Sequence, residues 1–216
     1  MRYTTVLFDL DGTLTDPAEG ITNAVRCALT GLGKDVPPYE ELLRFIGPPL
    51  LDAFRDFCGM DEEESLRALA LFREYYTATG IHQNRLLPYA KEMLHALKNA
   101  GRTLILATSK PEVQAISVLT DFEILDLFDA VAGSTLDQSR AKKEDVILYA
   151  LSLVGGRNPA DCIMVGDRFY DVIGARACGI DTLGVLCGYG SREELLSSGA
   201  IATVPDLAEV VQILLH

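Results

Sequence analysis

The chain has 216 residues, of which 49% are hydrophobic and 23% charged, and its formal net charge is −12 at pH 7. A chain of this length can bury a sizeable apolar interior, as one large domain or as a core with a small insert, so neither a tiny module nor a disordered chain is expected. The negative charge opposes binding to a nucleic-acid polymer, and the 19 basic residues form no continuous stripe.

We expect neither a targeting segment nor a disulfide framework from this sequence. No apolar run approaches the ~18 residues of a membrane span, and the amino terminus lacks a signal-peptide core, so no membrane partner is expected. Five cysteines are an odd number, lie far apart and form no CxxC pair. We expect reduced thiols in a cytoplasmic protein. No heptad repeat or large exposed apolar stripe is visible, so the sequence is compatible with a monomer or a homodimer.

Short apolar runs alternate with stretches that carry apolar residues at helical spacing. The runs that predict strands are 4–8, 103–107, 130–133, 162–165, 182–186 and 201–204. The stretches that predict helices are 90–100, 113–119, 143–154, 170–178 and 207–215. This alternation predicts an α/β fold, a Rossmann-like parallel sheet with helices on both faces.

The alternation is interrupted after the first strand. Residues 16–85 instead indicate three or four helices, broken by VPPYE, GPPL and CGMDEEE. We therefore expect a core domain of residues 1–15 and 86–216 and a helical cap domain of residues 16–85. An insert that leaves from the end of the first strand would lie above the ligand site of an open α/β sheet.

The first strand ends in FDLDGTLTD, which places Asp9 and Asp11 two residues apart. Residues i and i+2 of an extended segment point the same way, so both carboxylates would face the mouth of the sheet. Close carboxylates repel unless a cation lies between them or one holds a proton. The pair indicates a metal site or an acid/base partnership, and Gly12 would allow a tight turn after it. A polar strand end followed by a turn remains open as the alternative.

Hydroxyl groups end the next strand, at Thr108 and Ser109 of LILATSKP. Hydroxyls and backbone amides at a strand's carboxyl end suit a phosphate oxygen, although either residue could equally cap the following helix. Further on, Lys142 and Lys143 open a predicted helix, where a basic side chain works against the macrodipole. An anion could hold one of them there, or both could be surface lysines.

Two further carboxylates follow the strand at 162–165, within IMVGDRFYDVIGA. Asp167 lies just past the strand, and Asp171 lies four residues on, at the start of a helix. Carboxylate oxygens are the ligands that Mg²⁺ prefers, so Asp167 could complete a metal site. Asp167 could also be a helix cap and Asp171 a first-turn acid.

With these motifs in this order, the sequence resembles the haloacid dehalogenase superfamily of phosphohydrolases over essentially the whole chain. Their four motifs match Asp9-Leu10-Asp11-Gly12-Thr13, then Thr108, then Lys143, then Gly166-Asp167 with Asp171. Arg140 sets the register that favours Lys143 over Lys142.

Two sequence segments indicate a branch within that superfamily. FIGPPL and GVLCGYGSREEL resemble the phosphoglycolate phosphatase-like or 5′-nucleotidase-like proteins. Cys187 stands where those relatives often have Trp, and Tyr89 stands where Gly is usual.

The resemblance implies a Mg²⁺-dependent phosphomonoester hydrolase for a small phosphorylated metabolite, of the phosphoglycolate or nucleoside monophosphate type. Asp9 would form an aspartyl-phosphate and Asp11 would act as acid and base, while Thr108 and Lys143 hold the transferring oxygens. The expected metal ligands are Asp9, Asp11 through its main-chain carbonyl, Asp167 and Asp171, the last directly or from an outer shell. The expected substrate contacts are Gly12, Thr13, Ser109 and Arg44.

Other functions share these residues. A phosphomutase would pass the same aspartyl-phosphate to a second sugar phosphate, and a non-catalytic phosphate-binding module would keep only the site. A dehalogenase would need neither Asp11 nor the metal-binding acids. Arg44 and Arg55 of the cap could contact the leaving group or lie on the surface.

Overall fold

The computed structural model describes residues 3–137 and 139–215. The chain divides into two compact units. The core unit comprises residues 1–16 and 86–216, and the inserted unit comprises Pro17–Arg85. The expected cap domain, 16–85, begins one residue earlier than this unit.

The core unit is built on a six-stranded sheet with the order β5-β4-β1-β6-β7-β8, in which every neighbouring pair is parallel. Its strands are β1 (Thr5–Phe8), β4 (Thr103–Pro111), β5 (Ala130–Ser134), β6 (Cys162–Gly166), β7 (Asp181–Val185) and β8 (Ala202–Val204). The predicted parallel sheet is confirmed, and β4 extends beyond the apolar run 103–107, through Thr108 and Ser109 to Pro111.

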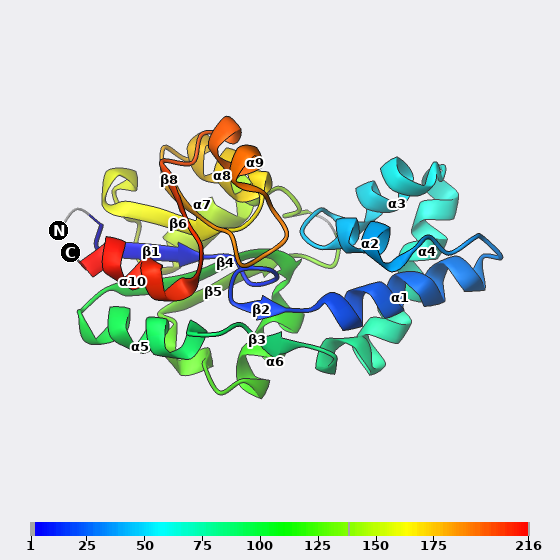
Figure 1. Cartoon of the computed structure of the whole chain (residues 1–216), viewed down its shortest axis with the longest axis horizontal. Helices are drawn as coiled ribbons and strands as arrows, with labels where there is room; N and C mark the ends of the chain where they lie inside the picture. The colour runs from blue at the N-terminus through cyan, green and yellow to red at the C-terminus, as the bar shows by residue number, and fades with distance from the viewer. Residues whose placement is uncertain (1–2, 138, 216) are drawn as a thin grey trace. The chain divides into compact units, whose positions relative to one another are not determined.

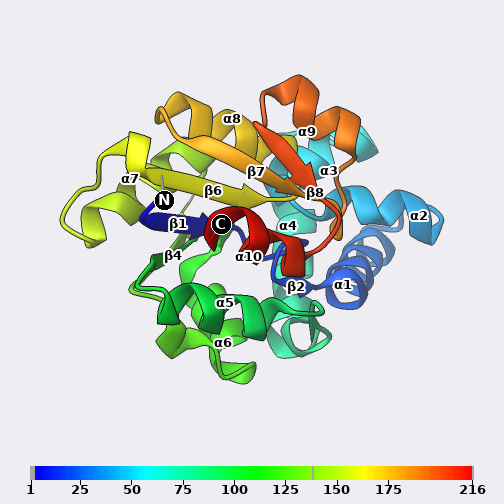
Figure 2. The same cartoon turned by 60° about the vertical axis from the view of Figure 1, so that its left-hand side comes forward.

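Helices cover both faces of this sheet, with α7 and α8 on one side and α5 and α10 on the other (Figures 1 and 2). The helices are α5 (Ala90–Asn99), α6 (Glu112–Asp121), α7 (Lys143–Leu153), α8 (Phe169–Ala177), α9 (Arg192–Ser198) and α10 (Leu207–Leu215), with 3₁₀ helices at Leu125–Leu127 and Pro159–Asp161. The short α9 was not predicted.

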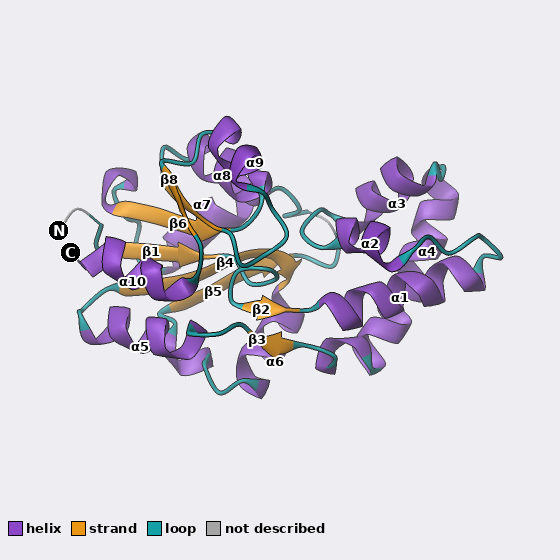
Figure 3. Ribbon diagram, viewed as in Figure 1, coloured by secondary structure: helices purple, strands orange, loops and turns teal. Residues whose placement is uncertain are grey.

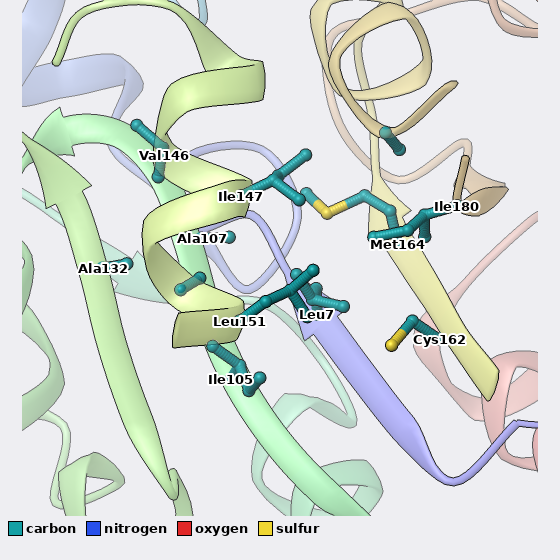
Figure 4. Close-up of a cluster of buried hydrophobic side chains, with 12 residues drawn as sticks. Leu7, Ile105, Ala107, Ala132, Val146, Ile147, Leu151, Cys162, Met164 and Ile180 are labelled. Atoms are coloured by element: carbon teal, nitrogen blue, oxygen red, sulfur yellow. The ribbon is translucent and has the colours of Figure 1, made fainter. Parts of the chain in front are cut away.

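Apolar side chains from the central strands pack beneath α7 (Figure 4). Leu7, Ile105 and Met164 come from three adjacent strands and meet Val146 and Ile147 of α7, all fully buried. Strands buried on both faces are uniformly apolar rather than alternating, which is why these runs are recognisable in the sequence. The packing fixes the carboxyl ends of β4, β1 and β6 side by side.

The inserted unit is almost entirely helical (Figure 3). It contains α1 (Ala18–Gly31), α2 (Tyr39–Leu42), α3 (Leu50–Cys58) and α4 (Glu62–Ala78), with 3₁₀ helices at Leu43–Phe45 and Gly80–His82. Aromatic rings form much of its core, with Phe54 lying 5.3 Å from Phe45 and 6.5 Å from Phe72 between ring centroids. The Asp61 side chain caps α4 by accepting the Glu64 N–H.

Two very short strands, β2 (Thr15–Asp16) and β3 (Arg85–Leu86), pair as a separate sheet. They lie where the chain leaves and re-enters the core unit. Two residues are too few to produce a recognisable pattern, so neither strand was predicted. Among the described residues, no helix combines the length and apolar character needed to cross a membrane.

Candidate active site

The predicted site residues come from strands that are neighbours in the sheet. Asp9 directly follows β1, Thr108 lies in β4, and Asp167 directly follows β6. Because parallel strands present their carboxyl ends at one edge, these side chains gather there. Lys143 is added by the first turn of α7, which packs on the same strands.

Lys143 is the centre of a buried ion-pair network. Its Nζ lies 2.8 Å from Asp9 Oδ1 and 2.7 Å from Asp171 Oδ1. Burial disfavours the ammonium, yet Asp171 and Asp9 together raise the pKa of Lys143 above its usual value. Burial also raises the pKa of Asp171 to about 6, against the opposing effect of Lys143. The neighbouring Lys142 is exposed.

Asp167 is fully buried, and uncharged groups donate to both of its carboxylate oxygens. Its Oδ1 accepts a hydrogen bond from Thr13 Oγ1 at 3.2 Å, and its Oδ2 accepts one from the Tyr189 N–H at 2.8 Å. Burial, and then the charges of Asp171 and Asp9, raise the pKa of Asp167 well above its ordinary value. Gly12 has φ +90°, and a Cβ there would overlap the Asp167 carboxylate.

The sequence left open that Thr108, Ser109 or Asp167 caps the helix that follows it, and in the structure none of the three does so. The residue that precedes α6 is Pro111, and Arg168 precedes α8. Thr108 Oγ1 instead accepts the Lys110 N–H at 3.2 Å. Asp171 does contact the start of its helix, because its Oδ2 accepts the Arg168 N–H at 3.1 Å.

Asp11 pairs with a lysine that the sequence analysis did not single out. Lys110 Nζ lies 2.7 Å from Asp11 Oδ2 and 3.1 Å from Asp11 Oδ1. The side chains of Lys110 and Asp11 are 4% and 13% exposed. Burial raises the pKa of Asp11, and Lys110 opposes that rise.

The charges of this cluster fit a divalent cation. One carboxylate oxygen from each of Asp9, Asp167 and Asp171 lies within 4.8 Å of the others. With Asp11 the cluster holds four carboxylates and, in Lys110 and Lys143, two ammonium groups, which leaves two carboxylate charges unbalanced when all are ionised. Buried like charges are costly without a counter-ion, and an all-oxygen donor set of this kind suits Mg²⁺.

The remaining predicted substrate contacts lie in different surroundings. The Gly12 N–H donates to the Thr15 carbonyl at 2.7 Å, and Ser109 is partly exposed at the end of β4. Arg44 belongs to the inserted unit, where it is exposed and its guanidinium lies 4.3 Å from the centre of the Phe57 ring. Contact of these residues with a substrate stays a prediction.

Two residues of the site were missed. Lys110 could have been found, because Thr108 and Lys110 are two apart in a strand and so point the same way. Tyr189, in the segment Gly188-Tyr189-Gly190, donates a hydrogen bond from its N–H to Asp167 and one from its hydroxyl to Asp16. No sequence pattern predicts that contact, because residues 187–190 reach Asp167 only through the fold.

Comparison with known proteins agrees with this geometry. The family model described as Haloacid dehalogenase-like hydrolase matches residues 6–185. The crystal structure of a predicted phosphatase from Clostridium acetobutylicum superimposes with a TM-score of 0.96 at 41% identity, covering 100% of this chain and 99% of that one.

Two curated relatives extend the comparison. A 5′-nucleotidase from Pseudomonas aeruginosa is 42% identical over 214 residues, which are 99% of this chain and 96% of that protein. Tyrosine-protein kinase PtkA from Mycobacterium tuberculosis is 38% identical over 205 residues, 95% of this chain but 69% of that protein. The chain therefore belongs to the haloacid dehalogenase-like hydrolase family and is a phosphatase of that family.

Proposed function

We propose that this chain is a Mg²⁺-dependent phosphomonoesterase that works through an aspartyl-phosphate on Asp9 and acts on a small phosphorylated metabolite. One observation carries the proposal: the buried Asp9 carboxylate accepts from Lys143 at 2.8 Å and lies in an oxygen cluster with Asp167 and Asp171. An ionised carboxylate beside a fixed ammonium can attack phosphorus while the charge of the phosphoryl group is offset.

In the first step an Asp9 oxygen forms a bond to phosphorus and the bond to the ester oxygen breaks. Asp11 gives its proton to the departing alkoxide, so the products are an alcohol, an aspartyl-phosphate and ionised Asp11. The Lys143 ammonium has three N–H donors, and its two ion pairs use two of them. We assign the third, together with the Thr108 hydroxyl, to the transferring oxygens.

In the second step Asp11 takes a proton from a water molecule. The water oxygen attacks phosphorus, the bond to Asp9 breaks, and inorganic phosphate leaves. Asp9 is then ionised again and Asp11 protonated, which restores the starting state. Asp171 lies 2.7 Å from the Lys143 ammonium, and we assign it to hold that ammonium in both steps.

Asp9, Asp167 and Asp171 are the side chains that would hold Mg²⁺, with the Asp11 carbonyl as a further ligand. When bound, the ion screens the repulsion between the attacking carboxylate and the phosphate and polarises the phosphoryl group. Thr13 and the Tyr189 N–H orient the Asp167 carboxylate for this role.

The inserted unit is proposed to act as a cap that reads the leaving group, with Arg44 among its contacts. Phosphoglycolate or a nucleoside monophosphate is the proposed kind of substrate, in line with the sequence resemblance and with the name of the Pseudomonas relative. A cytoplasmic location is proposed because all five cysteines are free thiols.

Phosphate release tests the function. The parent should release inorganic phosphate from p-nitrophenyl phosphate with Mg²⁺ and lose that activity in EDTA. A panel of 2-phosphoglycolate, nucleoside monophosphates and sugar phosphates then ranks the substrates. Conversion of one sugar phosphate into another without phosphate release would indicate a phosphomutase, and label transfer from ATP to a protein tyrosine would indicate a kinase. No turnover of any ester would contradict the proposal.

A further inference from the structure

The steps described above use Asp11 but give no role to Lys110, the lysine with which Asp11 forms a buried pair. Both Asp11 oxygens receive a contact from the same Nζ, at 2.7 and 3.1 Å. Two contacts from one buried ammonium restrict the movement of the Asp11 carboxyl group more than a single contact would. A lysine that is 4% exposed gives up hydration and side-chain freedom to make such a contact.

The sheet brings the two residues together. β1 and β4 are parallel neighbours, with Phe8 opposite Leu106. Asp11 lies three residues past Phe8 and Lys110 four past Leu106, so both lie at the same edge. Thr108 and Lys110 are both buried, as expected for side chains two apart on one face of a strand. The Lys110 N–H also donates to Thr108 Oγ1, which ties the backbone at Lys110 to the proposed phosphate-holding residue.

The two carboxylates of the Asp-x-Asp pair thus have separate lysines. Asp9 is held by Lys143 at the start of α7, and Asp11 is held by Lys110 at the end of β4. Each carboxylate is assigned a different task, attack on phosphorus or proton transfer, and each task needs its own orientation. A side chain that exchanges a proton with a reacting oxygen must lie within hydrogen-bond reach of it.

We propose that Lys110 is a positioning residue, which holds the Asp11 carboxyl group in the orientation from which it protonates the leaving group. This inference rests on the proposed function and adds a residue to it. Lys110 is assigned no contact with the substrate, because both of the Nζ contacts given above are made to Asp11. Its removal should therefore affect only the reactions that need Asp11.

Leaving groups of different acidity distinguish this role from a general one. The alcohol released from 2-phosphoglycolate or adenosine 5′-monophosphate needs a proton, whereas the phenolate released from 2,4-dinitrophenyl phosphate does not. The parameter kcat/KM reports the step in which the leaving group departs. Asp11→Asn serves as the reference, because it removes the acid itself and should lower kcat/KM strongly for the alkyl ester and weakly for the dinitrophenyl ester.

Lys110→Met should also lower kcat/KM more for the alkyl ester than for the dinitrophenyl ester, but by smaller factors than Asp11→Asn. We expect kcat/KM to fall about 10- to 100-fold for the better alkyl substrate and less than about threefold for the dinitrophenyl ester. Complete loss of general acid catalysis costs roughly 10²- to 10⁴-fold, and a misplaced acid should cost less than a missing one. Lys110→Arg keeps a charged donor and should recover part of the alkyl-ester rate. Lys98→Met is the matched control, because Lys98 makes a 2.7 Å pair with Asp129 outside the site, and it should change neither rate.

Circular dichroism shows whether each variant is folded, and Lys110→Arg is judged by the same contrast if the Met variant is not. An equal loss for both esters, or no loss for either, would overturn the positioning role of Lys110. Absence of the contrast in Asp11→Asn would instead contradict the acid role of Asp11, and absence of turnover by the parent would contradict the proposed function itself.

Discussion

Buried charge distinguishes the two units of this protein. Among the described residues, all the buried charged side chains belong to the core unit: Asp9, Arg102, Lys110, Lys143, Asp167 and Asp171. In the inserted unit the buried polar residues are Thr22 and Ser65, both uncharged, and the interior is otherwise apolar and rich in aromatic rings.

The difference shows where the chain departs from what stability alone favours. Apolar burial stabilises the inserted unit, whose charged residues, such as Arg55 with Asp52, form surface pairs that contribute little. The core unit instead buries carboxylates beside one another, an arrangement typical of functional sites. Chemistry should therefore depend on the core unit, and the surface of the inserted unit can change substrate preference without affecting that chemistry.

The largest expected effect follows from Asp9→Asn. An amide keeps the shape of the side chain but is a poor nucleophile, so turnover should fall roughly 10⁴-fold or more while both units stay folded. Phosphate release and circular dichroism measure the two properties. Asp35→Asn makes the same chemical change at an exposed position of the inserted unit and should leave the rate unchanged. Activity of Asp9→Asn within about tenfold of the parent would rule out the covalent mechanism.

An intermediate effect is expected for Asp167→Asn, which removes one carboxylate charge from the metal cluster. Turnover should fall roughly 10²-fold for every phosphate ester, because the change weakens metal binding and not leaving-group contacts. Thermal unfolding gives a second readout. Mg²⁺ with beryllium fluoride should raise the Tm of the parent and protect this variant much less. Equal protection of both proteins would place the metal elsewhere.

The smallest effects are expected in the inserted unit. Arg44→Ala and Arg55→Ala should each change kcat/KM by about tenfold or less, and by different factors for different esters, so that the ranking of substrates changes. Arg44 loses its contact with the Phe57 ring and Arg55 its pair with Asp52, neither of which supports the core unit. If both variants lowered all substrates by one factor, the inserted unit would have no role in leaving-group recognition.

Much of the fold follows from local patterns. Each strand of the six-stranded sheet contains a short apolar run, and Gly101, Gly155 and Gly179 have positive φ just after α5, α7 and α8. β2 and β3 were missed because two-residue strands are specified by pairing and not by a pattern. The apolar run 103–107 covers only part of β4, because the residues that follow it in the strand, Thr108, Ser109 and Lys110, are polar.

The candidate site was predictable to the extent that its residues lie at strand ends. Asp9, Thr108 and Asp167 lie at one edge of the sheet because parallel neighbouring strands end there. Which lysine contacts which carboxylate was not predictable, since it depends on side-chain reach across β1, β4 and α7. The Tyr189 N–H was also hidden, because any residue supplies a backbone donor and only the fold brings this one to Asp167.

Trapping of the phosphorylated enzyme tests the central claim most directly. The parent with Mg²⁺ and an ester labelled in its phosphoryl group is quenched in acid during the first turnovers, digested, and analysed by mass spectrometry and label counting. We predict that the label is found on the peptide containing Asp9, is released by hydroxylamine as expected for an acyl phosphate, and is missing from Asp9→Asn. Label on another residue, or phosphate release with no labelled enzyme at any time, would contradict the covalent role of Asp9.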